Sequence, residues 1–150
     1  MNRRARLVST GAFVLGLLVG GYLFADSQKR SLLAVRECEN CLYPNEIAGL
    51  LASVAIQRTP GLLPNVVLET DLTLVIEHPA PQAENHVVLI PKRDIKNVGS
   101  VAEGDEAYIV DLMASASRIV QERGLKDYRI WSNGPANQLV AYLHFHLAGN

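Results

Sequence analysis

One long amphipathic segment, between two groups of strand-like runs, sets most of the limits on the fold. Ser100-Val-Ala-Glu103 has the sequence of a capping box, in which a serine hydroxyl and a glutamate satisfy free amides at a helix start. Apolar residues then recur at helical spacing as far as Arg123, and Gly124 occupies the position of a left-handed cap. The pattern predicts one long helix over 101–123, whose apolar stripe faces a core or a dimer partner.

Strand-like runs lie on both sides of this helix. Alternating apolar residues and turn residues predict five strands, over residues 65–69, 72–77, 86–90, 127–132 and 139–147. A short helix is expected before the first strand, where Pro44 begins and Thr59-Pro60-Gly61 ends a run of helical periodicity. The order of strands, one long helix and strands again predicts an α+β fold with a mostly antiparallel sheet.

The N-terminal region has a different composition from the rest of the chain. Leu7 to Ala25 is uncharged throughout and is flanked by basic residues, and such a run can span a bilayer as a helix. A cleaved signal peptide is the alternative, although Leu23-Phe24-Ala25 lacks the small residues that precede a cleavage site. We expect a basic tail at 1–6, a transmembrane anchor at 7–25, a juxtamembrane linker at 26–37 and a folded domain at 38–150.

The charges that flank the expected anchor and the two cysteines both relate to the side of the membrane on which the domain lies. The excess of basic charge before the anchor predicts a single-pass membrane protein with a cytoplasmic N terminus and the domain outside. There the thiols of Cys38-Glu-Asn-Cys41 could form a disulfide, whereas inside they would stay reduced or bind metal. A formal net charge of −1, with scattered basic residues, predicts no nucleic-acid partner.

The end of the chain places polar rings at alternate positions. Tyr142, His144 and His146 alternate with apolar residues, so strand geometry puts the three on one face. Histidines in this pattern suit a metal site, a nucleophile with a supporting imidazole, or a phosphate-binding surface, and a structural pair without a chemical role is the other interpretation. Asn133-Gly134 and Asn137-Gln138 precede the strand, and their amide donors favour an anion.

Two of these segments together resemble a known family. Gln138-Leu-Val-Ala-Tyr-Leu-His-Phe-His-Leu147 resembles the signature of the histidine triad (HIT) family, a glutamine followed by three alternating histidines. His86-Val-Val-Leu-Ile-Pro-Lys92 resembles the family's upstream strand, and the likeness extends over roughly 38–149. It implies a HIT-like α+β fold, a mostly antiparallel sheet with one long helix, here preceded by an N-terminal transmembrane helix. It also implies a homodimer built around the long helix.

The resemblance implies a function as well. Members bind a nucleotide or nucleotide conjugate and hydrolyse or transfer a nucleoside monophosphate through a histidine intermediate, with no cofactor required. His144 would be the nucleophile that attacks the α-phosphorus. The residues expected to hold the phosphate and the nucleotide are His86, Asn133, Gln138 and His146.

Three departures from the family pattern keep a second interpretation open. Tyr142 replaces the first triad histidine, Leu139 stands where a serine often follows the glutamine, and His78 aligns with an acidic residue that meets the ribose. The alternative to an enzyme is therefore a catalytically inactive module that senses a nucleotide or binds another protein.

Zinc is a further implication of the resemblance. Some bacterial members have a similar CxxC near the start and use it with two histidines to bind zinc, and the corresponding positions here are Asp94 and Tyr142. Aspartate is a zinc ligand, whereas neutral tyrosine is a poor one. The resemblance thus implies at most an incomplete zinc site, with the three ligands Cys38, Cys41 and Asp94. A disulfide between the cysteines is the alternative.

Overall fold

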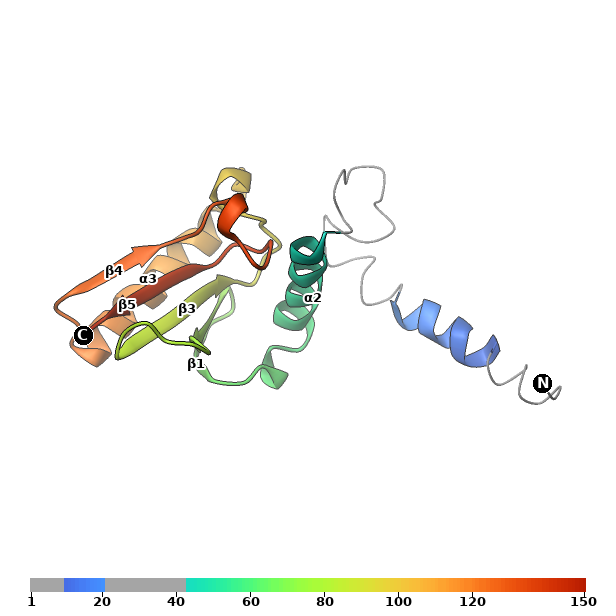
Figure 1. Ribbon diagram of the computed structural model, residues 1–150, viewed down its shortest axis with the longest axis horizontal. Coiled ribbons are helices and arrows are strands. Elements are labelled where there is room, and N and C mark those ends of the chain that lie inside the picture. Colours follow the sequence, from blue (N-terminus) through green and yellow to red (C-terminus); the bar gives the residue numbers. More distant parts are fainter. Residues whose placement is uncertain (1–9, 21–42) are drawn as a thin grey trace. The chain divides into compact units, whose positions relative to one another are not determined.

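The computed structural model describes residues 10–20 and 43–150 of the 150-residue chain. The chain divides into two compact units, Met1–Glu39 and Asn40–Asn150. In the first unit residues 10–20 form an α-helix (Figure 1). Its side chains are almost all exposed. The second unit contains the sheet and two further α-helices, so the rest of the description concerns that unit.

The predicted transmembrane helix requires a correction. Of the expected span 7–25, the structure describes residues 10–20, and these are helical. Within the described ranges no helix combines the length and the apolar character needed to cross a membrane. The expected anchor is therefore wrong, and so is the single-pass placement derived from it, with a cytoplasmic N terminus and an external domain. The expected tail at 1–6 and linker at 26–37 lie outside the described residues.

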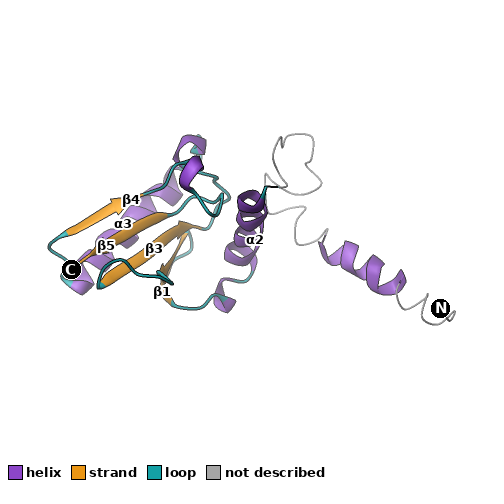
Figure 2. Ribbon diagram, in the orientation of Figure 1, coloured by secondary structure: helices purple, strands orange, loops and turns teal. Residues whose placement is uncertain are grey.

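Five strands form one antiparallel sheet in the second unit. They are β1 Val66–Glu69, β2 Thr73–Glu77, β3 Asn85–Pro91, β4 Tyr128–Trp131 and β5 Phe145–Gly149. Their order in the sheet is β1-β2-β3-β5-β4, and every neighbouring pair is antiparallel (Figure 2). The expected α+β fold with an antiparallel sheet is confirmed.

The helices differ from the single long helix that was expected. The described parts of the chain form three α-helices: residues 10–20, α2 Pro44–Arg58 and α3 Glu106–Arg123. Helix α3 begins later than the capping box predicts, because Asp105 is its N-cap residue and Val98–Ser100 forms a separate 3-10 turn. Its C-terminal cap is as expected: Gly124 has a φ of 63° and donates its N–H to the carbonyl of Gln121.

Apolar side chains pack on both faces of the sheet. One cluster joins strands β2, β3 and β5 to α3 and consists of Val75, Val87, Leu89, Leu112, Ala116, Ile119 and Leu147. The other joins β2 and β3 to α2 and consists of Ile56, Leu74, Val88, Ile90 and Tyr142. Residues of β2 and β3 alternate between the two clusters because successive side chains of a strand point to opposite faces. Helix α3 therefore covers one face, and α2 covers part of the other, where the site lies.

Candidate active site

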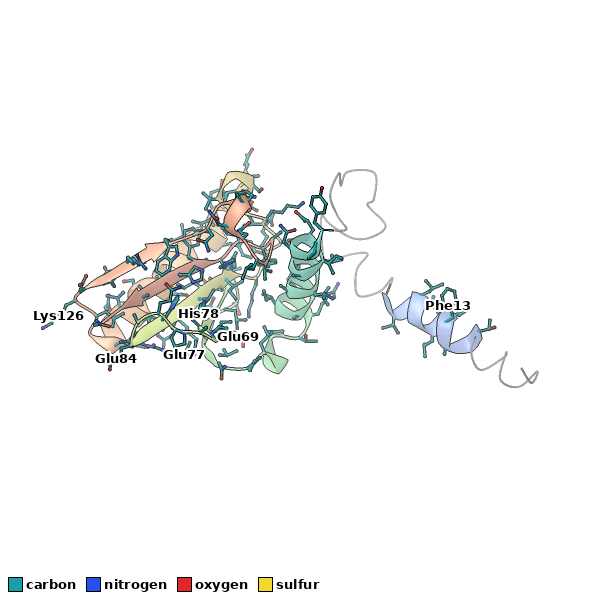
Figure 3. All side chains as sticks on the ribbon, in the orientation of Figure 1. Phe13, Glu69, Glu77, His78, Glu84 and Lys126 are labelled. Carbon is teal, nitrogen blue, oxygen red and sulfur yellow. The ribbon has the colours of Figure 1, made fainter. Side chains whose placement is uncertain are left out.

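The four histidines of the chain come together on the face of the sheet that carries α2. His78 directly follows β2, where its backbone N–H donates to the carbonyl of His86 in β3 at 2.8 Å. Their rings stack with centroids 4.1 Å apart, and Figure 3 labels His78 at this position. His146 of β5 lies 5.3 Å from the His86 ring and 5.2 Å from the His144 ring. Strand pairing thus brings together residues that are far apart in the sequence.

Hydrogen bonds fix which nitrogen carries the proton on each ring. Nδ1 of His78 accepts the Ala80 N–H at 3.0 Å, and Nδ1 of His86 accepts the Gln82 N–H at 3.1 Å. Both neutral rings must therefore carry their proton on Nε2. The Nε2–H of His86 in turn donates to Nδ1 of His146 at 3.1 Å, so His146 also carries its proton on Nε2.

His144 has the opposite arrangement. Its Nδ1 lies 2.7 Å from the carbonyl oxygen of Tyr142, which can only accept a hydrogen bond. The proton of the neutral ring is therefore on Nδ1, and Nε2 carries a lone pair. Among the four imidazoles, His144 alone presents an unprotonated Nε2, and this is the state that a nucleophile or a base requires.

Two of the rings are held neutral by their surroundings. The pKa of His146 is lowered to about 4, chiefly by burial and also by the neighbouring His144, His86 and His78. Burial also lowers the pKa of His86, with smaller contributions from His78 and Arg129 against an opposing one from Glu77. The Nε2–H of His146 is buried and has no hydrogen-bond partner within the described residues. It is a donor without an acceptor, as expected of a group that binds an oxygen of a ligand.

Two cavities meet at these histidines. The larger, which we name the His144 cavity, has a volume of about 620 Å³ and a mostly apolar wall. Its wall includes Ala52, Ile56, Val88, Ile90, Val140, Tyr142, His144 and His146. The smaller, which we name the Arg129 cavity, has a volume of about 300 Å³ and is lined by His78, Gln82, His86, Arg129, Ile130, Trp131, Asn133 and His146. His78, Gln82, Asn133 and His146 line both, so the two cavities are continuous.

The predicted site residues are only partly brought together. His86, Asn133, His144 and His146 all line one or both cavities. Gln138 lines neither: it is buried, and its amide nitrogen donates to the carbonyl of Lys96 at 3.2 Å. Strand β5 begins at Phe145, not at the expected Leu139, because the backbone N–H groups of Ala141 and Leu143 donate to the carbonyls of Asn45 and Ile95 and not to a neighbouring strand.

Tyr142, at the first position of the expected triad, is a buried core residue. Its ring is 1% exposed and belongs to the apolar cluster under α2. Its hydroxyl donates to the carbonyl of Pro91 at 2.8 Å. This internal hydrogen bond takes up the hydroxyl proton, so the hydroxyl does not donate to a ligand.

Several lining residues were not predicted as site residues. His78, Arg129 and Trp131 reach the cavities because β2 and β4 flank the histidine-bearing strands. Trp131 stacks on His146 with ring centroids 4.9 Å apart, and the guanidinium of Arg129 lies 4.5 Å from the centre of the Trp131 ring. The alternation within β4 places Arg129 and Trp131 on one face, so the sequence of this strand could have indicated both as site residues.

Three of the histidines lie close enough together to be considered as a metal site. Ring nitrogens of His78, His86 and His146 lie within 4.8 Å of one another, a spacing that a metal ion could bridge. A histidine that binds metal normally donates its other ring N–H to an acceptor. Here Nδ1 of both His78 and His86 faces a backbone N–H, so a lone pair at Nε2 would leave each ring without a proton. The cluster presents N–H donors and suits an anion better than a cation.

The zinc site implied by the resemblance is a separate matter. Cys38 and Cys41 lie outside the described residues, and Asp94 is half-buried in the loop after β3. Zinc bound by these residues, or a disulfide between the cysteines, stays a prediction.

Comparison with known proteins relates more than half of the chain to one family. Residues 63–150 match the HIT domain. An uncharacterised HIT-like protein of Synechococcus elongatus is 36% identical over 88 residues, which cover 57% of this chain and 77% of the relative. A HIT-like protein of Synechocystis sp. is 33% identical over 87 residues, which cover 56% and 76% respectively.

Solved structures agree with this relationship. The HIT family hydrolase from Clostridium thermocellum superposes with a TM-score of 0.60 and 28% identity, over 75% of this chain and 92% of that one. The HIT family hydrolase from Legionella pneumophila superposes with a TM-score of 0.58 and 29% identity, over 63% of this chain and 89% of that one.

Proposed function

This chain belongs to the HIT family, and on that premise we propose that it binds a nucleotide or nucleotide conjugate and transfers the nucleoside monophosphate group through His144. The observation that carries the proposal is the protonation pattern of the four imidazoles. His144 alone offers a lone pair at Nε2, and the neighbouring rings offer N–H donors. A nucleophile surrounded by donors is what phosphoryl transfer requires.

The proposed reaction has two steps. The Nε2 lone pair of His144 forms a bond to the α-phosphorus while the bond from phosphorus to the leaving group breaks, and the leaving group takes that electron pair. Water then attacks the same phosphorus, loses a proton to the solvent and displaces His144, which recovers its lone pair. The products are the nucleoside monophosphate and the free leaving group. No cofactor enters either step.

The walls of the His144 cavity support a division of roles. The apolar side chains of α2 and β3, among them Ile56 and Val88, suit the base of a nucleotide. The buried Nε2–H of His146 and the amide of Asn133 suit the non-bridging phosphate oxygens. The contact of Gln138 with Lys96 supports a positioning role in which the glutamine holds the loop before His144.

Trapping the covalent intermediate tests the proposal. The full-length protein is mixed with a substrate labelled at the α-phosphorus, and denatured protein is analysed for label on histidine. We expect label on the wild type and none on His144→Ala, with hydrolysis reduced by several powers of ten. The variant must show the wild-type thermal unfolding curve. Equal hydrolysis by both proteins, or label on another residue, would remove the catalytic role of His144.

A catalytically inactive sensing or protein-interaction module is the second candidate. The observation that favours it is Tyr142, because a hydroxyl donated to Pro91 does not replace the missing triad histidine at the phosphate. Calorimetry with a panel of nucleotides separates the two functions. Binding without turnover, and the same affinity in His144→Ala, would favour the module.

We also propose a homodimer, which the family relationship suggests. Exposed apolar residues on α3 and on the edge strand β4 support such an interface, among them Val110, Met113 and Ile130. Light scattering coupled to gel filtration measures the mass directly. A monomer at micromolar concentration would contradict this part of the proposal.

A further inference from the structure

Asn133 and Gly134 form the only Asn-Gly pair in the chain. In such a pair the backbone nitrogen of the glycine can attack the side-chain carbonyl carbon of the asparagine, because a glycine has no Cβ to hinder the approach. The product is a succinimide ring, and its hydrolysis leaves an aspartate or an isoaspartate. Asparagine is thermolabile for this reason. Among the asparagines of the chain, Asn133 therefore has the sequence neighbour that most favours loss of the side-chain amide.

The local structure leaves this pair open to the reaction. Strand β4 ends at Trp131 and a 3-10 turn spans Pro135–Asn137, so the pair lies outside the hydrogen bonds of the sheet. Gly134 is exposed, and no atom lies within 4 Å of the position that a Cβ would take. Among the described residues, neither the Gly134 N–H nor the Asn133 side chain has a hydrogen-bond partner. The attacking nitrogen and the attacked carbonyl are thus both unrestrained by hydrogen bonds.

A carboxylate at this position would change the charge of the site. Asn133 lines both the His144 cavity and the Arg129 cavity, and no aspartate or glutamate is among the lining residues of either. Conversion to aspartate removes the amide donor that suits a phosphate oxygen. It also brings a negative charge to the wall that Asn133 shares with His146, where it repels a bound phosphate. Loss of one amide therefore turns an anion-binding wall into one that rejects anions.

We infer that Asn133 is a modification site, at which spontaneous deamidation closes the anion-binding site. First a bond forms between the Gly134 nitrogen and Cγ of Asn133 while the bond from Cγ to the amide nitrogen breaks. The amide nitrogen leaves as ammonia and takes the proton of the Gly134 N–H. Water then opens the succinimide at one of its two carbonyls, which leaves a carboxylate on aspartate or isoaspartate. The loss of nucleotide binding rests on the proposed function, whereas the modification itself does not.

Mass spectrometry of stored protein tests the modification. The full-length protein is kept for days in mildly alkaline buffer and digested, and peptides are searched for conversion of an amide to a carboxylate. We expect conversion at Asn133, and faster conversion at higher pH because the attacking nitrogen must lose its proton. Asn137 is the control within the same loop: it is exposed too, but the N–H of the following Gln138 donates to the carbonyl of Pro135 at 3.5 Å. Asn137 should stay intact.

Gly134→Ala is the matched variant. Gly134 has a φ of −73° and a ψ of 166°, which alanine adopts without strain, and the added Cβ meets open space. The variant should therefore keep the wild-type thermal unfolding curve. The same Cβ hinders the attack on Asn133, so conversion should be slower by roughly tenfold or more. An intact Asn133 in stored wild type, or equal conversion in the two proteins, would overturn the modification site.

Calorimetry with adenosine monophosphate tests the closing of the site. We expect Asn133→Asp and stored wild type to bind roughly tenfold more weakly than fresh wild type, or weaker still. Stored Gly134→Ala should keep the affinity that it had when fresh. Conversion without a change in affinity would show that deamidation does not close the site, and the proposed function would stand. If fresh wild type does not bind the nucleotide, the proposed function fails and the closing of the site is overturned with it, while the mass spectra alone decide the modification.

Discussion

Protonation of His146 opposes folding, because the ring is buried beside other imidazoles. Burial is the main cause of its lowered pKa, and His144, His86 and His78 add to the effect. The ring titrates near pH 4 in the folded chain and near 6.5 when unfolded. Between these values the unfolded chain binds a proton that the folded chain does not, so the free energy of unfolding falls with falling pH by about 1.4 kcal/mol per pH unit.

We predict that His146→Asn removes most of this loss. Urea unfolding curves of the wild type and the variant, recorded between pH 7 and 4.5, give the free energy of unfolding at each pH. The free energy of unfolding of the wild type should be highest above pH 6.5 and should fall towards pH 4. That of the variant should fall less. Because the pKa of His86 is lowered too, a smaller slope should remain. Parallel pH profiles for the two proteins would contradict the prediction.

Tyr142 contributes to stability through its hydroxyl. Phenylalanine at this position would keep the buried ring but leave the carbonyl of Pro91 without its donor. We predict that Tyr142→Phe lowers the free energy of unfolding by about 1 to 2 kcal/mol. Tyr43→Phe is the matched control, since Tyr43 is 59% exposed, and should change stability by less than about 0.5 kcal/mol. An equal effect of the two changes in urea unfolding would refute this role.

At the scale of elements, the start of α3 shows how local sequence rules can mislead. Ser100 and Glu103 satisfy the capping-box pattern, yet the helix begins at Glu106. Gly104, with a φ of 89°, turns the chain, and the carboxylate of Asp105 accepts the Ala102 N–H at 2.9 Å. Asp105 is also buried in an ion pair with Arg93 from the loop after β3. The local pattern predicted a start at Ser100, whereas the observed start coincides with this tertiary contact.

We therefore predict different effects for the two possible caps. Asp105→Ala removes the hydrogen bond to Ala102 and the ion pair with the partly exposed Arg93, so it should cost about 1 to 2 kcal/mol of stability. Ser100→Ala changes an exposed side chain and should cost less than about 0.5 kcal/mol. Thermal and urea unfolding of both variants measures the difference. A larger loss from the serine change would restore the capping box as the helix start.

The strands show where sequence patterns are sufficient. Alternation identified β2 and β3 closely, because both are central strands whose side chains are buried alternately under α2 and α3. The same alternation rule predicted that β5 begins at Leu139, which is too early. Polar and apolar residues alternate before Phe145 too, but that segment has no neighbouring strand. Gln138 was expected at the phosphate because of the family resemblance, whereas its contact with Lys96 depends on the path of a loop.

At the scale of the whole molecule, both apolar clusters found among the described residues belong to the second unit. Both apolar clusters are formed by residues between Ala52 and Leu147. We predict that a chain of residues 40–150 folds alone and unfolds within a few degrees of the full-length protein. Differential scanning calorimetry compares the two. Loss of a cooperative transition in the shorter chain would show that the first unit contributes to the fold.

The two largest differences between expectation and structure also arise at this scale. Hydropathy alone suggested a membrane anchor over residues 7–25, whereas no helix within the described residues is long and apolar enough to cross a membrane. The predicted site joined His86 to His144 and His146 through the family resemblance. His78 and Arg129 join them only through the strand order β2-β3-β5-β4, which no local pattern reveals.

The stacking of Trp131 on His146 has an optical consequence. Trp131 is the single tryptophan of the chain, and it lies between the Arg129 guanidinium and an imidazole of the site. Its fluorescence therefore comes from one place, with no background from other indoles. An anion that draws Arg129 away from the indole, or a proton that charges His146, changes the quenching of that emission. The protein thus carries its own spectroscopic reporter, and ligands can be ranked by titration without labelling.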